Sequence, residues 1–122
     1  MEGKTKRIFL VEVDALVAVE IKDTLKDLGF EVVGPSMRLD NAIHVAQHDQ
    51  IDIGFLEVDL GPGLTTEPVA AILRGRKIPY AFLTAYDSGR IKFLRKNDLV
   101  IYKPASPRDL LDAVQQLEKQ RP

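Results

Sequence analysis

Arg7-Ile-Phe-Leu-Val-Glu-Val-Asp-Ala-Leu-Val-Ala18 holds the transition on which the architecture depends: an apolar run, then acidic residues, then an amphipathic segment. The apolar positions of that segment recur at helical spacing, at Val17, Ile21, Leu25 and Leu28. Asp14 is placed to cap this helix, and Gly29 follows where a left-handed residue would end it. A strand that leads through a polar turn into a helix is the repeating unit of a parallel α/β sheet.

The same alternation of short apolar runs and amphipathic segments continues along the chain. It predicts five strands, over residues 7–11, 30–33, 51–56, 79–83 and 99–102. It predicts four more helices: one capped by Asp40, one from Thr66 to near Gly75, one over 88–96 and one that starts at Ser106. Ser106, Pro107 and Asp109 have the order of a capping box. Residues 61–63, Gly-Pro-Gly, are interpreted as a flexible connection into the third helix.

Length and charge limit the classes of function. The chain has 122 residues and 45% hydrophobic content, so we expect one domain over residues 1–122. Its 17 basic and 18 acidic residues leave a net charge of -1, so we expect neither nucleic acid nor a membrane as a partner. The absence of cysteine excludes disulfides and thiolate chemistry. The apolar runs are too short to span a bilayer and no signal-peptide core precedes the first strand, so we expect a cytoplasmic protein.

The residues that directly follow the predicted strands form the candidate site, because ligands bind at the carboxyl ends of parallel strands. They are Glu12-Val13-Asp14, Glu57-Val58-Asp59, Thr84-Ala85-Tyr86 and Lys103-Pro104. Carboxylates suit a hard cation such as Mg²⁺, and an ammonium group suits a phosphoryl oxygen. This edge of the sheet is therefore suited to phosphate and a cation.

The opening stretch, Phe82-Leu-Thr-Ala-Tyr86 and Lys103-Pro104 together resemble the receiver domain of bacterial two-component response regulators, over nearly the whole chain. The resemblance implies a flavodoxin-like, doubly wound sheet of five parallel strands in the order 2-1-3-4-5, with five helices. It also implies a signalling module of a phosphorelay. Glu57 then takes the phosphoacceptor position, Glu12, Val13 and Asp14 form the acidic pocket, and the switch and phosphate-contact positions are Thr84, Val100 and Lys103.

Two positions depart from the family pattern, and both affect the same reaction. Glu57 stands in place of the acceptor aspartate, and Val13 in place of the second acidic residue. Because Val13 supplies no oxygen ligand, we expect no Mg²⁺ at the vestigial metal positions, Glu12, Glu57 and Asp59. The extra methylene of Glu57 moves its carboxylate by about 1 Å, and such a misplacement costs on the order of 10²-fold in rate.

The sequence therefore predicts a pseudo-receiver that is not an enzyme, needs no cofactor and acts by binding other proteins. Glu57 would either reach Lys103 and Thr84 and imitate an acyl phosphate, or the pocket would have lost its signalling value; the sequence leaves both open. The alternative is a receiver that accepts a phosphoryl group on Glu57 with Mg²⁺. A small-molecule-binding flavodoxin-like domain would need a phosphate-binding loop that residues 12–14 do not provide.

The resemblance also implies a partner face on the fourth helix, fifth strand and fifth helix, for a histidine kinase, a downstream effector or a second copy of the chain. Its charged residues are Arg90, Arg95, Lys96, Asp98, Arg108, Asp109 and Asp112. Val100 stands where the family often has an aromatic switch residue, and Tyr86 is interpreted as a packing residue with its hydroxyl in water. His44 and His48 share a helix face, but without a third ligand nearby we assign them no role.

Overall fold

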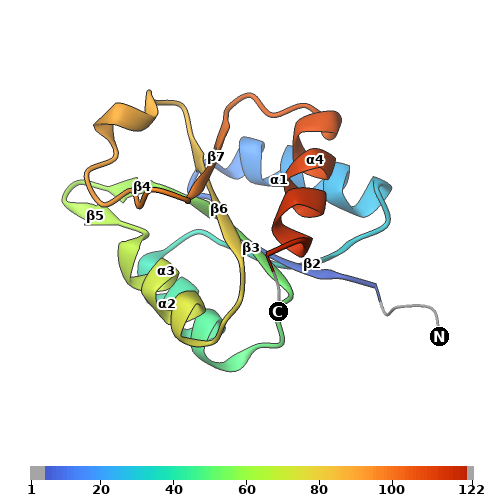
Figure 1. Ribbon diagram of the computed structural model, residues 1–122, viewed down its shortest axis with the longest axis horizontal. Helices are drawn as coiled ribbons and strands as arrows, with labels where there is room; N and C mark the ends of the chain where they lie inside the picture. The colour runs from blue at the N-terminus through green and yellow to red at the C-terminus, as the bar shows by residue number, and fades with distance from the viewer. Residues whose placement is uncertain (1–4, 121–122) are drawn as a thin grey trace.

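The computed structural model describes residues 5–120, in which a five-stranded parallel sheet lies between two layers of helices (Figure 1). The sheet strands are β1 (Arg7–Val11), β2 (Glu31–Ser36), β3 (Ile53–Glu57), β6 (Tyr80–Thr84) and β7 (Leu99–Tyr102). Their order is β2-β1-β3-β6-β7, and every neighbouring pair is parallel. Since β4 and β5 form a separate hairpin, β6 and β7 are the fourth and fifth sheet strands. The predicted order 2-1-3-4-5 is therefore confirmed.

Alternate side chains of the strands supply a core on each side of the sheet. Along β1, Ile8 belongs to one core and Phe9 to the other, as the twofold repeat of a strand requires. One side is covered by α1 (Ala15–Asp27) and α4 (Pro107–Glu118), the other by α2 (Leu39–His48) and α3 (Glu67–Gly75) (Figure 1). Because helices cover both sides, every residue of β3 and β6 is buried.

Two of the helices begin as the sequence predicts. At α1, Asp14 Oδ1 accepts hydrogen bonds from the backbone amides of Leu16 and Val17, at 3.0 and 3.2 Å. At α4, Ser106 Oγ accepts from the backbone N–H of Asp109 at 3.0 Å, and the Asp109 carboxylate accepts from the backbone N–H of Ser106 at 2.9 Å. This reciprocal pair is the capping box, and it satisfies two amides that have no partner within the helix.

The other two helices begin differently. Arg38, not Asp40, precedes α2, and Asp40 lies in its first turn, where its carboxylate is 3.1 Å from the Arg38 guanidinium. An acidic side chain is favourable there because the first amides of a helix carry partial positive charge. Thr66 precedes α3 as predicted, but its hydroxyl makes no capping bond and is buried without a hydrogen-bond partner among residues 5–120.

The Gly61-Pro62-Gly63 segment is the turn of a short hairpin within the predicted connection to the third helix. It joins β4 (Asp59–Gly61) to β5 (Leu64–Thr65) in an antiparallel pair. Gly61 and Gly63 have φ values of 129° and 71°, which residues with a side chain rarely adopt. The hairpin carries the chain from the carboxyl end of β3 to the start of α3.

The fourth of the five predicted helices is not an α-helix. Residues 88–96 contain one 3₁₀ turn, η1 (Ser88–Arg90), and then further turns. Gly89 weakens any helix in this segment. The apolar residues that pack on the core, Ile91, Phe93 and Leu94, lie within four consecutive positions, so they do not extend over two turns as the apolar face of an amphipathic helix does. Residues 5–120 therefore hold four α-helices. None of these is long and apolar enough to cross a membrane.

Candidate functional site

Four polar side chains from four strands meet at one edge of the sheet. Glu12 directly follows β1, and Glu57 is the last residue of β3. Thr84 is the last residue of β6, and Lys103 directly follows β7. Because all four strands are parallel, their carboxyl ends lie at the same edge, which is where ligands bind in open α/β sheets. The structure thus brings together the residues that the sequence placed after the strands.

Lys103 bridges the two carboxylates of this edge. Its ammonium group lies 2.9 Å from Glu12 Oε1 and donates a second, short hydrogen bond to Glu57 Oε1. The side chains of Glu12 and Glu57 are 0% and 7% exposed, and that of Lys103 is 16% exposed. Buried charges require partners, and here each carboxylate has the lysine as its counter-ion.

The second oxygen of each carboxylate is also engaged. Glu12 Oε2 accepts a hydrogen bond from the Asp14 amide at 3.1 Å, and Glu57 Oε2 accepts one from the Asp59 amide at 3.2 Å. Each carboxylate therefore contacts Lys103 through one oxygen, and through the other oxygen it accepts from the backbone amide two residues later in the sequence. The bridge and the two amides fix the turns that follow β1 and β3 in one arrangement.

Thr84 lies outside the ion pair. It is fully buried, and its hydroxyl oxygen accepts a hydrogen bond from the Tyr86 amide at 2.9 Å. Within residues 5–120, no hydrogen bond joins Thr84 to Glu57, whereas the expected contact of Glu57 with Lys103 is present.

Tyr86 has contacts that the sequence interpretation missed. Its hydroxyl lies 3.4 Å from Asp59 Oδ2, and the Arg90 guanidinium lies 5.2 Å from the centre of its ring. A guanidinium at this distance over an aromatic face is attracted by the ring. Tyr86 therefore links η1 to the turn after β3. The position of Tyr86, two residues after Thr84 at the carboxyl end of β6, is the sequence feature that indicates a place near the site.

Burial and charge act in opposite directions on the two ends of the bridge. Burial raises the pKa of Glu57 above its ordinary value, although the hydrogen bond and charge of Lys103 oppose that shift. Burial alone would lower the pKa of Lys103, but its hydrogen bonds to Glu57 and Glu12 outweigh burial and raise that pKa. The ammonium form of Lys103 is therefore favoured at neutral pH.

The oxygen donors at this edge fit Mg²⁺ poorly. Mg²⁺ demands near-octahedral oxygen coordination, whereas Val13 offers no oxygen and Asp14 caps α1. Asp59 is exposed, and the Lys103 ammonium already occupies one oxygen of Glu12 and one of Glu57. Residues 5–120 contain no group of three or more His, Cys, Asp or Glu side chains arranged to hold a metal ion. His44 and His48 on α2, whose ring centres lie 4.6 Å apart at an interplanar angle of 45°, belong to no such group.

The remaining predicted positions are dispersed. Val100 is half-buried and packs against the core beneath α2 and α3. The charged residues of the expected partner face lie in separate places. On exposed parts of α4 lie Arg108, Asp109 and Asp112. Arg90 lies in η1, and around the amino end of β7 lie Arg95, Lys96 and Asp98.

No protein-family model matches the sequence. The transcriptional regulatory protein PdtaR of Mycobacterium tuberculosis is 25% identical over 114 residues, which are 90% of this chain and 55% of PdtaR. The chain therefore spans about half the length of this curated relative.

Solved structures give a stronger likeness. A CheY-like response regulator receiver domain from Methanospirillum hungatei JF-1 has a TM-score of 0.82 at 24% identity, covering 96% of this chain and 97% of that one. The receiver domain of a sensor histidine kinase from Pseudomonas aeruginosa PAO1, with a magnesium ion coordinated in its active-site cleft, has a TM-score of 0.78 at 24% identity. That match covers 93% of this chain and 98% of the kinase domain. The chain has the fold of response-regulator receiver domains.

Proposed function

We propose that this chain, which has the receiver fold, is a signalling module of a two-component or phosphorelay system that works without accepting a phosphoryl group. The observation that carries the proposal is the Lys103 bridge between Glu12 and Glu57. In this proposal residues 1–122 are one receiver-like domain, which acts in the cytoplasm as a binding module and not as an enzyme.

The engagement of Glu57 supports a phosphate-independent role. A phosphoacceptor needs a carboxylate oxygen that is free to attack in line, and a cation that neutralises the transferred group. One oxygen of Glu57 accepts from Lys103 and the other from the Asp59 amide. These contacts provide neither a free attacking oxygen nor a neutralising metal ion. Because Val13 has no carboxylate, the site also has one fewer possible metal ligand.

The length of Glu57 supports a fixed state of the site. The resemblance to receivers implies that the lysine at this position contacts the phosphoryl group on the acceptor. Here the longer carboxylate meets Lys103 directly, so the lysine has an anionic partner without any kinase. The proposal is therefore that the turns after β1, β3 and β7 hold one signalling arrangement permanently.

The outputs of such a module are contacts with other proteins. We propose a histidine kinase, a downstream effector or a second copy of the chain as the partner, bound along β7 and α4. A groove of about 300 Å³ between these elements supports this choice, with Asp109 and Asp112 among its lining residues. Neither nucleic acid nor a membrane is a partner in this proposal.

An amide NMR titration with Mg²⁺ and then beryllofluoride, which stands in for a phosphoryl group on a carboxylate, tests the proposal. We expect the resonances of Glu12, Glu57, Thr84 and Lys103 to stay in place through both additions. The matched control is the Val13→Asp/Glu57→Asp variant, whose resonances should move. If the unaltered chain responds to millimolar Mg²⁺ and again to beryllofluoride, it is instead a magnesium-dependent receiver that uses Glu57. This alternative is the one to test because the similar receiver domain of the Pseudomonas aeruginosa histidine kinase has a magnesium ion coordinated in its active-site cleft.

A further inference from the structure

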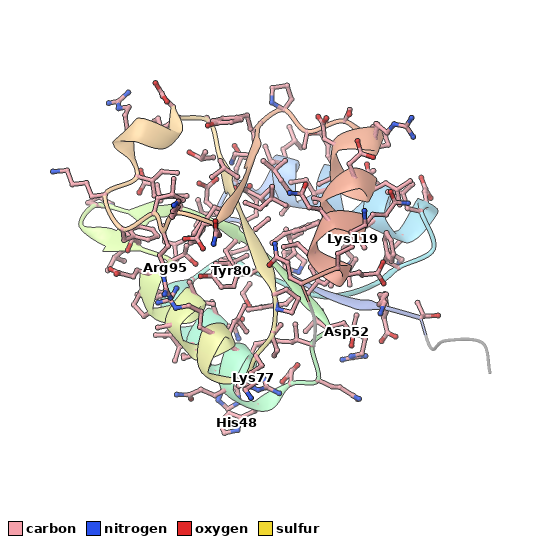
Figure 2. All side chains as sticks on the ribbon, viewed as in Figure 1. His48, Asp52, Lys77, Tyr80, Arg95 and Lys119 are labelled. Carbon is pink, nitrogen blue, oxygen red and sulfur yellow. The ribbon has the colours of Figure 1, made fainter. Side chains whose placement is uncertain are left out.

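A second pocket lies at the opposite end of the sheet from the Lys103 bridge. It has a volume of about 490 Å³ and lies where the amino ends of β6 and β7 meet the end of α3. Tyr80 begins β6 at this pocket and Thr84 ends it at the bridge, so four strand steps, roughly 13 Å, separate the two places. Figure 2 shows Tyr80 and Arg95 beside each other in this view, with Lys77 at the end of α3.

The pocket gathers positive charge. Its basic lining residues are Arg74, Lys77, Arg95 and Lys96. Asp98 is the one carboxylate among the lining residues that the structure describes. Since the whole chain has a net charge of -1, this is a local concentration of cations and not a property of the overall surface.

Hydrogen bonds inside the pocket hold its floor in place. The Tyr80 hydroxyl accepts a hydrogen bond from Arg74 at 2.6 Å and lies 3.4 Å from Asp98 Oδ1. Asp98 Oδ2 accepts from the backbone N–H of Arg95 at 2.8 Å. Both oxygens of the carboxylate are therefore directed at the protein, and Tyr80 is only 8% exposed. Asp98 fixes the turn before β7, and its single negative charge offsets one of the four basic side chains, so the lining keeps an excess of positive charge.

Three of the cations have no anionic partner in the described part of the chain. The side chains of Lys77, Arg95 and Lys96 make no ion pair or hydrogen bond within residues 5–120. All three are exposed at the pocket. Guanidinium and ammonium donors form charge-assisted hydrogen bonds with phosphate oxygens, and several such donors in one place suit a group that carries more than one negative charge.

The backbone of Lys77 gives a second, independent observation. Its φ is 62°, in the left-handed region, and its N–H donates to the Arg74 carbonyl at 3.0 Å while that of Ile78 donates to the Leu73 carbonyl at 2.9 Å. This is the helix-ending motif in which glycine is the favoured residue at that position. Lys77 occupies this position although the backbone there favours glycine, and its side chain lines the pocket.

We propose that this pocket binds a small organic phosphate that carries at least two negative charges. Lys77, Arg95 and Lys96 would hold the phosphate oxygens, and the apolar surface of Ile78 and Pro79 would contact the organic part. The volume of about 490 Å³ lies within the range of small-molecule sites and exceeds the needs of phosphate alone. Because the pocket lies at the far end of the sheet, this site is separate from the proposed function of Glu57.

Amide NMR titrations of the chain with adenosine, inorganic pyrophosphate and ADP test the site, since these probes supply the organic part, the charge, and both. We expect ADP and pyrophosphate to shift the amides of Lys77, Arg95 and Asp98, ADP to bind more tightly, and adenosine to have no effect. Shifts that scatter over basic residues elsewhere would overturn the proposal. An affinity for ADP no greater than that for pyrophosphate would overturn its organic part.

The Lys77→Gly variant makes the test specific. Glycine suits the backbone at this position, so we expect a higher melting temperature together with about tenfold weaker ADP binding, because one charged contact is lost. Lys26→Ala removes one exposed cation from α1, away from the pocket, and should leave ADP binding unchanged. The proposal is wrong if Lys77→Gly binds ADP like the parent, or if Lys26→Ala weakens binding equally.

Discussion

The ammonium group of Lys103 donates a hydrogen bond to the carboxylate of Glu57, although the two residues are 46 positions apart. The same ammonium reaches Glu12, so it ties together the ends of β1, β3 and β7. The free energy lost when two charges leave water is nearly as large as the free energy gained from their attraction. A buried ion pair therefore fixes the positions of its side chains more than it adds to the stability of the fold. The bridge therefore sets the geometry of the edge at which the receiver fold carries its site.

The Lys103→Met variant tests the bridge as a counter-ion. Methionine fills similar space but leaves Glu12 and Glu57 buried without a cation, so we expect the free energy of unfolding to fall by about 3 kcal/mol at neutral pH. The deficit should shrink towards about pH 5, because burial raises the pKa of Glu57 in the folded chain and the opposing lysine is gone. Urea denaturation at both pH values measures this effect. Lys92→Met, on an exposed turn, is the control, and an equal deficit at both pH values would contradict the prediction.

Alkaline pH tests the same bridge from the other side. The pKa of Lys103 is raised in the folded chain, because hydrogen bonds to Glu57 and Glu12 outweigh the effect of burial. A raised lysine pKa gives stability that is complete below the ordinary lysine value of about 10.4 and is lost as the pH rises through the folded value. The stability difference between the parent and Lys103→Met should therefore narrow above about pH 10. A difference that stays constant to the onset of alkaline unfolding would show that the lysine charge is not involved.

Much of the fold follows from local patterns. The strand order was reached by resemblance, but the strands themselves are apolar runs, and the caps at Asp14 and Ser106 are local hydrogen-bond chemistry. The prediction of a helix over 88–96 is wrong, because the alternation of strands and helices along the chain does not account for Gly89, and the structure holds only a 3₁₀ turn there. Its apolar residues pack on the core from turns, and only the tertiary structure decides between the two.

The sequence predicts which residues lie at the site better than it predicts the contacts between them. Strand ends placed Glu12, Glu57 and Lys103 at one edge, but whether the lysine would meet one carboxylate, both or neither depends on side-chain geometry. The basic pocket escaped prediction for a different reason. Its cations come from the last turn of α3, the turn before β6 and the turn before β7, and the two turns become neighbours because those two strands pair.

Restoring the two lost carboxylates should restore a metal site. We expect the Val13→Asp/Glu57→Asp variant to bind Mg²⁺ at millimolar concentrations, because it regains an oxygen ligand and the shorter acceptor side chain withdraws from Lys103. Isothermal titration calorimetry measures this binding. Each single variant supplies only half of the change and should bind more weakly. A double variant that ignores the ion would show that Val13 and Glu57 have been matched to the wrong positions.

Two adjacent threonines give a prediction on stability in which the same substitution has opposite effects. The Thr66 hydroxyl is fully buried without a hydrogen-bond partner, so Thr66→Val should raise the free energy of unfolding by about 1 kcal/mol at nearly constant volume. Thr65 is exposed, and its hydroxyl oxygen accepts a hydrogen bond from the Glu67 amide at the start of α3, at 3.3 Å. Thr65→Val should therefore lower stability by about 0.5 kcal/mol, since an amide at the helix start loses its partner. Urea denaturation of both variants beside the parent measures the two changes. If Thr66→Val is the less stable variant, then its hydroxyl has a partner, and the start of α3 depends on Thr66 and not on Thr65.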